Sequence, residues 1–238
     1  MVKAIIYDKD GTLMQFDAFW IPVAQAAIRS ILEKYTDARG EKAIKVAGEI
    51  ETEIGILNGV IDPKGVLCGG TYSQFAEIVD LVFKKSDVNA VIDRVAVERA
   101  VEENIEKGVI LPTCDDLRFK LEKARKTARI FVVTTDCGAV AEYCLKKLGI
   151  FDLFDAVFCD DGETPCKPDP FAANEIAREL SVEKNELFVV GDTETDKRFA
   201  DNAGVDFVFV GKEGAIKEKL KYKANNAGAA TDLILSFT

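Results

Sequence analysis

Hydrophobic and polar positions follow the pattern of an α/β protein along most of the chain. Five short segments are wholly apolar, which is typical of strands that are buried on both faces of a parallel sheet. These segments are Ala4–Tyr7, Ile130–Val133, Ala156–Cys159, Leu187–Val190 and Phe207–Val210. From residue 111 onward they are separated by stretches of helical periodicity. The pattern therefore predicts a doubly wound, mainly parallel sheet with helices on both faces.

The signals at the ends of the later helices agree with this alternation. Asp169 followed by Pro170 predicts a helix start, with an acid at the N-cap and proline at the first helical position. That helix is predicted to run to Leu180. A last helix near 215–222 and a last apolar run at 233–237 complete the expected pattern.

Residues 16–107 follow a different pattern, because helical periodicity continues there with no strong strand signal. A loop rich in glycine and proline separates the second predicted helix from the third, and Ser73 is the predicted cap of the third. The predicted helices cover residues 21–32, 41–56, 73–83 and 88–107. We therefore expect an α-helical cap domain at 16–107, inserted into a sheet domain formed by 1–15 and 108–238.

Charge and composition exclude several classes of function. The net charge of −10 and the pI near 4.8 argue against a nonspecific nucleic-acid binder and against a binder of anionic membranes. The chain has no histidine, which excludes Ser-His-Asp and Cys-His hydrolases and His-ligated zinc sites. The six cysteines show no Cys-x-x-Cys spacing, so we expect them to be reduced. Because there is no signal segment and no apolar run of membrane length, we expect a cytoplasmic protein.

Several polar residues follow the ends of the predicted strands. Open α/β sheets bind ligands at the carboxyl ends of their strands, so these residues are expected to meet at one edge of the sheet. They are Asp8, Asp10, Thr134, Lys167, Asp192 and Asp196. Carboxylates that gather in this way repel one another unless a cation lies among them. The pattern therefore predicts a bound Mg²⁺, a hard ion that takes carboxylate, carbonyl and water oxygens.

Four segments together resemble the signature of the haloacid dehalogenase superfamily, in its phosphoglycolate-phosphatase-like branch with a helical cap. They occur in the family's order and each lies at a predicted strand end. They are Asp8-Lys9-Asp10-Gly11-Thr12, Val132-Val133-Thr134, Lys167-Pro168-Asp169-Pro170 and Gly191-Asp192-Thr193-Glu194-Thr195-Asp196. The resemblance extends from Ile5 to Gly204 and implies a Rossmann-like core with an inserted cap.

The resemblance implies a role for each residue of these segments. Asp8 would attack phosphorus to form an aspartyl-phosphate. Asp10 would protonate the leaving group and then deprotonate the attacking water. Thr134 and Lys167 would bind the phosphoryl group and stabilise its charge in the transition state. Magnesium would be held by Asp8, the backbone carbonyl of Asp10 and Asp192, with Asp196 as a second acid that ligates the ion or positions water.

The resemblance also implies substrate-binding residues. In the core they would be Lys9, Gly11, Thr12 and Thr135, with the backbone amides of the first loop helping to hold the phosphate. Two of them depart from the family pattern, because Thr135 stands where many relatives carry asparagine and Lys9 occupies a position that is often apolar. In the cap, Gly69-Gly70-Thr71 corresponds to the family's specificity loop, although a surface turn before a capped helix explains the same residues equally well.

The expected function is that of a magnesium-dependent phosphatase. Its partner would be a small phosphorylated metabolite, a phosphate monoester of the phosphoglycolate or sugar phosphate type. The same residues would serve a β-phosphoglucomutase-like phosphomutase, which transfers the phosphoryl group to a sugar hydroxyl instead of water. A rival of another class is a non-catalytic metabolite sensor or interaction protein, which the presence of every expected acid disfavours. The sequence leaves the oligomeric state open.

Overall fold

The computed structural model describes residues 1–211, 216 and 220–237, and it divides the chain into two compact units. The core unit comprises Met1–Gln15 and Ile110–Thr238, and the helical unit comprises Phe16–Val109. The first boundary lies where the sequence places it, and the second lies two residues later than predicted, at Ile110 instead of residue 108.

The core unit contains one parallel sheet of six strands in the order β5-β4-β1-β6-β7-β8. Chain order reverses at β1, since β4 and β5 lie on one side of it and the later strands on the other. Such a reversal is where open α/β sheets bind their ligands. The strands are β1 (Ala4–Tyr7), β4 (Arg129–Val133), β5 (Ala156–Phe158), β6 (Leu187–Gly191), β7 (Asp206–Val210) and β8 (Tyr222–Ala224). A doubly wound parallel sheet is therefore confirmed.

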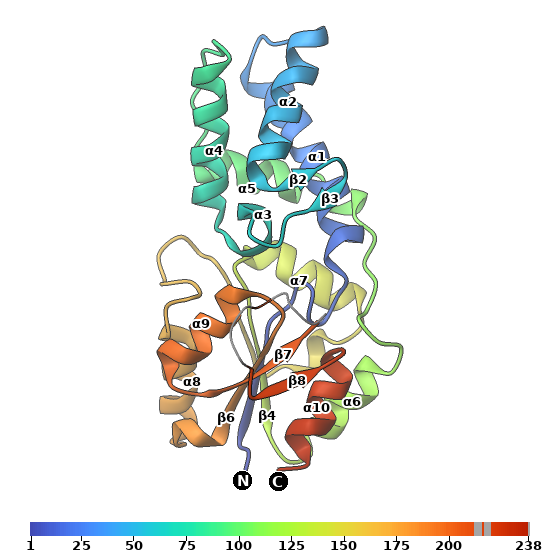
Figure 1. The fold of residues 1–238 in the computed structure, drawn as a ribbon, viewed down its shortest axis with the longest axis vertical. Helices are drawn as coiled ribbons and strands as arrows, with labels where there is room; N and C mark the ends of the chain where they lie inside the picture. Colours follow the sequence, from blue (N-terminus) through green and yellow to red (C-terminus); the bar gives the residue numbers. More distant parts are fainter. Residues whose placement is uncertain (212–215, 217–219, 238) are drawn as a thin grey trace. The chain divides into compact units, whose positions relative to one another are not determined.

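Helices cover both faces of this sheet because successive residues of each strand point to opposite sides. Ile5 and Tyr7 of β1 pack with α6, α7 and α10, whereas Ala4 and Ile6 pack with α8 and α9. Figure 1 shows α8 and α9 on one side of the sheet and α6 and α10 on the other. The helices of the core unit are α6 (Leu117–Ala124), α7 (Gly138–Lys147), α8 (Phe171–Leu180), α9 (Glu194–Ala203) and α10 (Ala227–Leu235), with short 3₁₀ turns η2 (Phe151–Leu153) and η3 (Lys184–Glu186).

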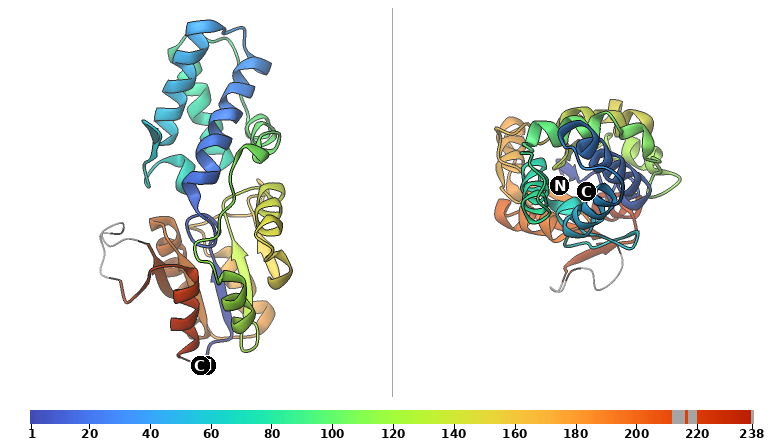
Figure 2. Two further views of the ribbon diagram at one scale, coloured as in Figure 1. Left: turned by 90° about the vertical axis from the view of Figure 1, so that its right-hand side faces the viewer. Right: turned by 90° about the horizontal axis from the view of Figure 1, so that it is seen from above.

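The helical unit is built on apolar stripes that pack against one another. The longest helix, α1, buries Phe19, Val23 and Ile28 completely, and α1 and α2 run side by side (Figure 2). The helices are α1 (Phe16–Tyr35), α2 (Gly40–Ile54), α3 (Val66–Gly69), α4 (Tyr72–Lys85) and α5 (Arg94–Glu102), followed by the 3₁₀ turn η1 (Ile105–Lys107). The predicted fourth helix is thus shorter than expected and begins at the N-cap Asp93, whose side chain accepts from the Ala96 amide.

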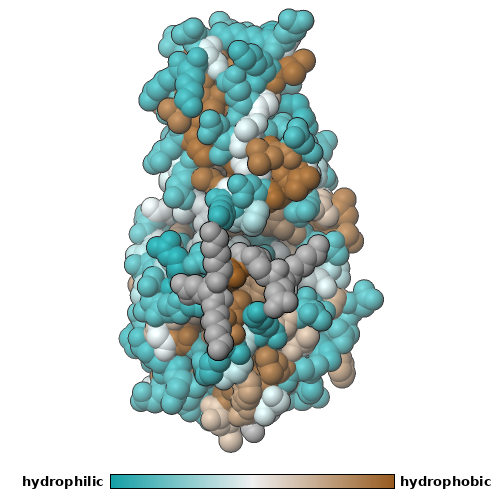
Figure 3. Space-filling model, in the orientation of Figure 1, coloured by the Kyte–Doolittle hydropathy of each residue, from teal (hydrophilic) through white to brown (hydrophobic). Residues whose placement is uncertain are grey.

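The helical unit also contains a two-stranded hairpin that the sequence pattern does not predict. The antiparallel strands β2 (Ile56–Leu57) and β3 (Val60–Ile61) flank Asn58-Gly59, and both turn residues have positive φ. This conformation suits a two-residue hairpin turn. Leu57 and Val60 are exposed, and apolar surface gathers over this hairpin (Figure 3).

Near the C-terminus the structure corrects two expectations. Within the predicted helix at 215–222, residues 215 and 217–219 lie outside the described residues, and Tyr222 begins the strand β8. The apolar run at 233–237 is largely the last turn of α10, because Ile234 packs against the same face of the sheet as Ile5.

Two further findings concern the whole described chain. All six cysteines are free thiols. Among the residues that the structure describes, none of the helices combines the length and the hydrophobicity needed to cross a bilayer.

Candidate active site

The predicted catalytic residues follow three neighbouring strands of the core unit. Asp8 comes directly after β1, Thr134 directly after β4 and Asp192 directly after β6. Since β4, β1 and β6 are adjacent and parallel, their carboxyl ends lie at the same edge of the sheet. The Asp8 amide extends the β1–β6 pairing by donating to the Val190 carbonyl over 2.8 Å, so the backbone of Asp8 is held by the sheet.

A tight turn after β1 holds Asp8 and Asp10 on one short segment. The carbonyl of Lys9 accepts from the amides of Leu13 (2.9 Å) and Met14 (3.1 Å), and the amide of Gly11 donates to the Met14 carbonyl (2.8 Å). Gly11 has φ of +77°, a conformation that favours glycine. The turn therefore holds the two acids in place through its backbone.

Lys167 joins two of the acids in what we call the Lys167 triad, Asp8–Lys167–Asp196. The Lys167 ammonium lies 2.5 Å from Asp8 Oδ1 and 2.7 Å from Asp196 Oδ1. Asp196 also accepts from the amide (3.0 Å) and hydroxyl (2.6 Å) of Thr193, which is the N-cap of α9. The three side chains are almost fully buried, so little water screens their charges.

Burial decides the electrostatics of this triad. It raises the pKa of Asp8 to about 7, an effect to which Asp196 and Asp10 add and which Lys167 opposes. Burial acts to lower the pKa of Lys167, but the attraction of Asp196 and Asp8 outweighs it, so that pKa lies above its usual value. The two carboxylates therefore favour the charged form of Lys167 beside the Asp8 carboxyl.

Asp192 completes a group of oxygens suited to a metal ion. One oxygen each from Asp8, Asp192 and Asp196 lies within 4.8 Å of the others. Burial, together with Asp8 and Asp196, raises the pKa of Asp192 well above its ordinary value. Thr12 donates to Asp192 Oδ1 over 3.2 Å and so fixes the orientation of this carboxylate.

The residues present fit magnesium. Asp8 Oδ2 and Asp10 Oδ1 are buried, and neither has a hydrogen-bond partner among the described residues, which is the expected state of oxygens that await a cation or a substrate. All candidate donors are hard oxygens, as Mg²⁺ prefers. Both oxygens of Asp196 already accept hydrogen bonds, so Asp8 and Asp192 offer the freer ligand atoms.

A second buried lysine forms what we call the Lys9 triad, Asp10–Lys9–Asp136. The Lys9 ammonium lies 2.7 Å from Asp10 Oδ2 and 2.8 Å from Asp136 Oδ2. Lys9 is fully buried and Asp136 is 6% exposed. Burial raises the pKa of Asp136 to about 8 against the opposing effect of Lys9, and Asp10 adds to the increase. Sequence reasoning missed Asp136, for which the available signal was an acid two residues after Thr134.

Thr134 stands at the edge of the site and Thr135 beside it. The Thr134 hydroxyl accepts from the amide of Asp136 over 3.2 Å, and its own amide donates to Phe158 on β5. This hydroxyl retains its proton for another acceptor. Thr135 is half-buried and is the less constrained of the two.

Two of the expected substrate-binding residues of the core have side chains that bond to the acids of the site. Lys9 and Thr12 are both fully buried, and the Lys9 ammonium contacts Asp10 while the Thr12 hydroxyl donates to Asp192. Gly11 likewise uses its amide within the turn, and a side chain there would collide with Asp192. The side chains of Lys9 and Thr12 and the amide of Gly11 are therefore bonded within the site.

The three predicted cap residues have local structural roles in the helical unit. Gly69 ends α3, and a side chain on Gly70 would lie 2.6 Å from Val66 Cγ1. Thr71, and not Ser73, is the N-cap of α4, and it exchanges side-chain and backbone hydrogen bonds with Gln74. The stretch therefore matches the turn before a capped helix that the sequence allowed.

Comparisons with known proteins agree with this site and fold. Residues 2–204 match the family model of the haloacid dehalogenase-like hydrolases. PpaX of Clostridium perfringens, which is named as a pyrophosphatase, is 24% identical over 205 residues, which make up 86% of this chain and 81% of PpaX.

Solved structures are similar over nearly the whole chain. CbbY from Rhodobacter sphaeroides, in complex with phosphate, is 18% identical with a TM-score of 0.65, and the match covers 96% of each chain. YfnB from Bacillus subtilis, a hydrolase bound to magnesium, is 13% identical with a TM-score of 0.62, and the match covers 98% of each chain. At this level of identity the likeness concerns the fold.

Proposed function

Because the chain belongs to the family of haloacid dehalogenase-like hydrolases, we propose that it is a magnesium-dependent phosphatase that acts on a small phosphate monoester. The observation that carries the proposal is the state of Asp8. Its Oδ1 is held by Lys167 at 2.5 Å, while its buried Oδ2 has no hydrogen-bond partner among the described residues. A carboxylate that is fixed at one oxygen and open at the other is arranged for nucleophilic attack.

Asp8 and Asp10 divide the chemistry between them. Asp8 Oδ2 attacks the phosphorus, the ester P–O bond breaks, and the departing alkoxide takes a proton from Asp10. A water molecule then returns its proton to Asp10 and attacks the aspartyl-phosphate, which releases inorganic phosphate and restores Asp8. Asp10 Oδ1 is the oxygen available for both proton transfers, since Lys9 holds Oδ2.

Lys167 and Thr134 are the groups of the chain that bind the phosphoryl oxygens. Lys167 remains cationic because two carboxylates hold its proton, so it stabilises negative charge that develops beside Asp8. Thr134 contributes a hydroxyl whose proton is not used by its contact with the Asp136 amide.

The charge of the site argues for the metal. Five carboxyl groups gather around two lysines, so full ionisation leaves an excess of three negative charges. A phosphate ester would add to this excess. Magnesium held by Asp8, Asp192, Asp196 and the Asp10 carbonyl would reduce the negative charge of the nucleophile and the phosphate when it is bound.

The comparisons support the proposal at this general level. PpaX carries the name of a pyrophosphatase, CbbY was solved with phosphate, and YfnB was solved with magnesium. A phosphoglycolate-like or sugar phosphate ester is the proposed partner, because each is a small monoester whose alkoxide needs the proton that Asp10 supplies.

The test is phosphate release from phosphoglycolate, a hexose phosphate, glycerol phosphate, a nucleotide and p-nitrophenyl phosphate, with magnesium and with EDTA. We expect turnover of at least one ester by the wild type with magnesium, and none with EDTA or by Asp8→Asn. Asp152→Asn is the matched control. Asp152 lies in the 3₁₀ turn η2, which precedes β5, and its exposed side chain pairs with Arg118 instead of with a residue of the site. A folded wild type that releases no phosphate from any ester contradicts the proposal.

A further inference from the structure

The Lys9 triad is a buried charge cluster for which the proposed reaction gives no reason. Lys9 is 0% exposed, and its ammonium contacts Asp10, Asp136 and, at 3.7 Å, the sulfur of Met14. Removing a lysine from water is costly unless its charge is closely paired. The fold nevertheless buries Lys9 next to the acid that the reaction uses.

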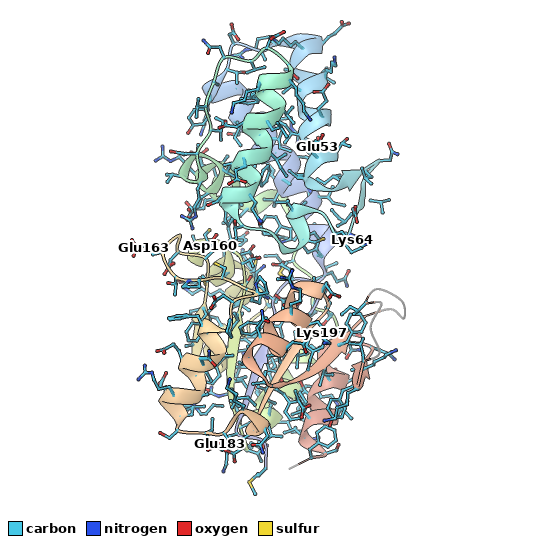
Figure 4. All side chains as sticks on the ribbon, turned by 60° about the vertical axis from the view of Figure 1, so that its left-hand side comes forward. Glu53, Lys64, Asp160, Glu163, Glu183 and Lys197 are labelled. Atoms are coloured by element: carbon cyan, nitrogen blue, oxygen red, sulfur yellow. The ribbon has the colours of Figure 1, made fainter. Side chains whose placement is uncertain are left out.

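The backbone of Asp136 is held by residues that follow two strands of the sheet. Its amide donates to the Thr134 hydroxyl over 3.2 Å, and its carbonyl accepts from the amide of Asp160 over 2.8 Å. Asp160 is the second residue after the end of β5. Figure 4 shows Asp160 and Glu163 at one end of the core unit, opposite Glu183. The backbone of Asp136 is therefore held by the segments that follow β4 and β5, at the edge of the sheet where the site lies.

Lys9 links Asp136 to Asp10, because its ammonium contacts one carboxylate oxygen of each. Asp10 belongs to the turn after β1, and its Oδ2 is tied to Lys9 whereas its Oδ1 is buried without a hydrogen-bond partner among the described residues. A carboxylate that is free to rotate would present either oxygen, in several orientations, to the leaving group. General acid catalysis depends on holding one oxygen within hydrogen-bond reach of the reacting atom.

We propose that Lys9, anchored by Asp136, is the positioning residue of the general acid, holding Asp10 by Oδ2 so that Oδ1 faces the leaving oxygen and then the attacking water. The lysine does not touch the substrate. It acts through Asp10, and Asp136 acts through Lys9.

This inference rests on the proposed function, and its test separates the two. The main variant is Lys9→Met combined with Asp136→Asn, which removes one positive and one negative charge and leaves Asp10 in place. The matched control is Lys221→Met combined with Asp206→Asn, a lysine–aspartate pair of 3.0 Å on the exposed surface of the core unit.

Two esters distinguish positioning of Asp10 from support of the fold. Phosphoglycolate, or the best alkyl ester of the panel, needs a proton on its leaving group, whereas p-nitrophenolate departs without one. For the alkyl ester we expect kcat of the main variant to fall by about 100-fold, with KM changed by less than about threefold. With p-nitrophenyl phosphate we expect the first-turnover burst to persist and the steady-state rate to fall, since hydrolysis of the aspartyl-phosphate still needs Asp10.

The outcomes are decisive in both directions. A main variant whose kcat for the alkyl ester stays within about threefold of wild type overturns the inference, and so does an equal loss of the p-nitrophenol burst. A wild type that hydrolyses no ester contradicts the proposed function instead. A crystal structure of the main variant gives a readout without turnover: we expect Asp10 to leave its position, and an unmoved Asp10 overturns the inference.

A second variant, Asp136→Ala, tests the same inference if the main variant does not fold. Asp136→Ala keeps Lys9 and removes only its anchor. We again expect kcat for the alkyl ester to fall, here by about tenfold, while the p-nitrophenol burst persists. An unchanged kcat in a folded Asp136→Ala protein overturns the inference.

Discussion

Gly11 and Asp192 approach each other so closely that a methyl group on Gly11 would lie 2.0 Å from Asp192 Oδ2. The two residues follow neighbouring strands, β1 and β6, and the missing side chain leaves room for the Asp192 carboxylate beside the turn that carries Asp8 and Asp10. Gly11 also has φ of +77°. Two independent constraints therefore require glycine at this position.

The first prediction is that Gly11→Ala damages both the site and the fold. The new methyl group must displace Asp192, and the backbone must hold alanine in a left-handed conformation, at a cost of about 1–3 kcal/mol in the free energy of unfolding. Displacing Asp192 is expected to lower kcat/KM by about 100-fold. Urea unfolding and phosphate release measure the two effects.

Gly138→Ala is the control for this prediction. Gly138 begins α7, and a Cβ there would meet no atom within 4 Å. We expect a change within about 0.5 kcal/mol and unchanged activity. Equal effects of the two substitutions would contradict the role assigned to Gly11.

The second prediction concerns magnesium and the stability of the fold. Asp8, Asp192 and Asp196 repel one another in the metal-free protein, so a bound cation stabilises the folded state. At a free magnesium concentration 100 times the Kd, the expected gain is about 2.7 kcal/mol. The measurement is the thermal unfolding midpoint of EDTA-treated protein during titration with magnesium.

Asp192→Asn provides the matched comparison for the metal. It removes one of the repelling charges and keeps the shape of the side chain, so the metal-free variant is expected to unfold at a higher temperature than the metal-free wild type. The variant is also expected to gain little from magnesium. A full magnesium shift in Asp192→Asn would remove Asp192 from the proposed ligands.

The sequence predicts the sheet well because its strands are buried on both faces. Ile5 and Ile6 pack against different layers of helices, yet both are apolar, so the strand appears in the sequence as a continuous hydrophobic run. The position of Asp8 and Asp192 at strand ends follows from the same pattern. The hairpin at Asn58-Gly59 was missed because strands of two residues are too short for any periodicity to appear.

The Lys9 triad was missed for a different reason. A lysine beside two acids is normally solvated, and nothing in the local pattern shows that its ammonium is buried. Its partner Asp136 lies more than a hundred residues away in the chain and reaches it only because β1 and β4 are adjacent. Contacts of this kind depend on tertiary packing. The Thr71 cap of α4 was missed because Ser73, two residues later, is an equally good cap by residue type.

The third prediction concerns pH and the loop after β5. Asp161 accepts from the amides of Glu163 (2.9 Å) and Thr164 (2.7 Å) and from the Thr164 hydroxyl. These hydrogen bonds lower its pKa from 3.8 to about 2, with the Thr164 hydroxyl as the largest cause. The contribution of Asp161 to stability is therefore complete above pH 3.8, declines as pH falls toward 2, and is lost below it.

Carboxyl ¹³C NMR titration measures this pKa directly. Thr164→Val removes the hydroxyl donor and is expected to move the pKa of Asp161 up toward 3.8, while Thr164→Ser keeps the donor and the low value. A wild-type pKa at or above 3.8 would contradict the hydrogen bonds described for this loop.

The fourth prediction concerns the hydrogen bond between Tyr7 and Thr231, which joins β1 to α10 beneath the site. The hydroxyl oxygens lie 2.8 Å apart and both residues are fully buried. Thr231 donates its own proton to the Ala227 carbonyl over 2.7 Å, so Tyr7 must be the donor to Thr231. Removing the Tyr7 donor and removing the Thr231 acceptor are therefore expected to have different effects on stability.

Tyr7→Phe removes the donor and leaves Thr231 still bonded to Ala227, so we expect a loss of about 0.5–1.5 kcal/mol in the free energy of unfolding. Thr231→Val instead leaves the Tyr7 hydroxyl buried without its acceptor, which costs about 1–3 kcal/mol. The double variant removes both polar groups and is expected to lose less than the sum of the single variants. Urea unfolding of the four proteins measures this cycle. A Thr231→Val protein no less stable than Tyr7→Phe would reverse the assigned direction of the hydrogen bond, because only an unmatched donor at Tyr7 makes the valine variant the weaker of the two.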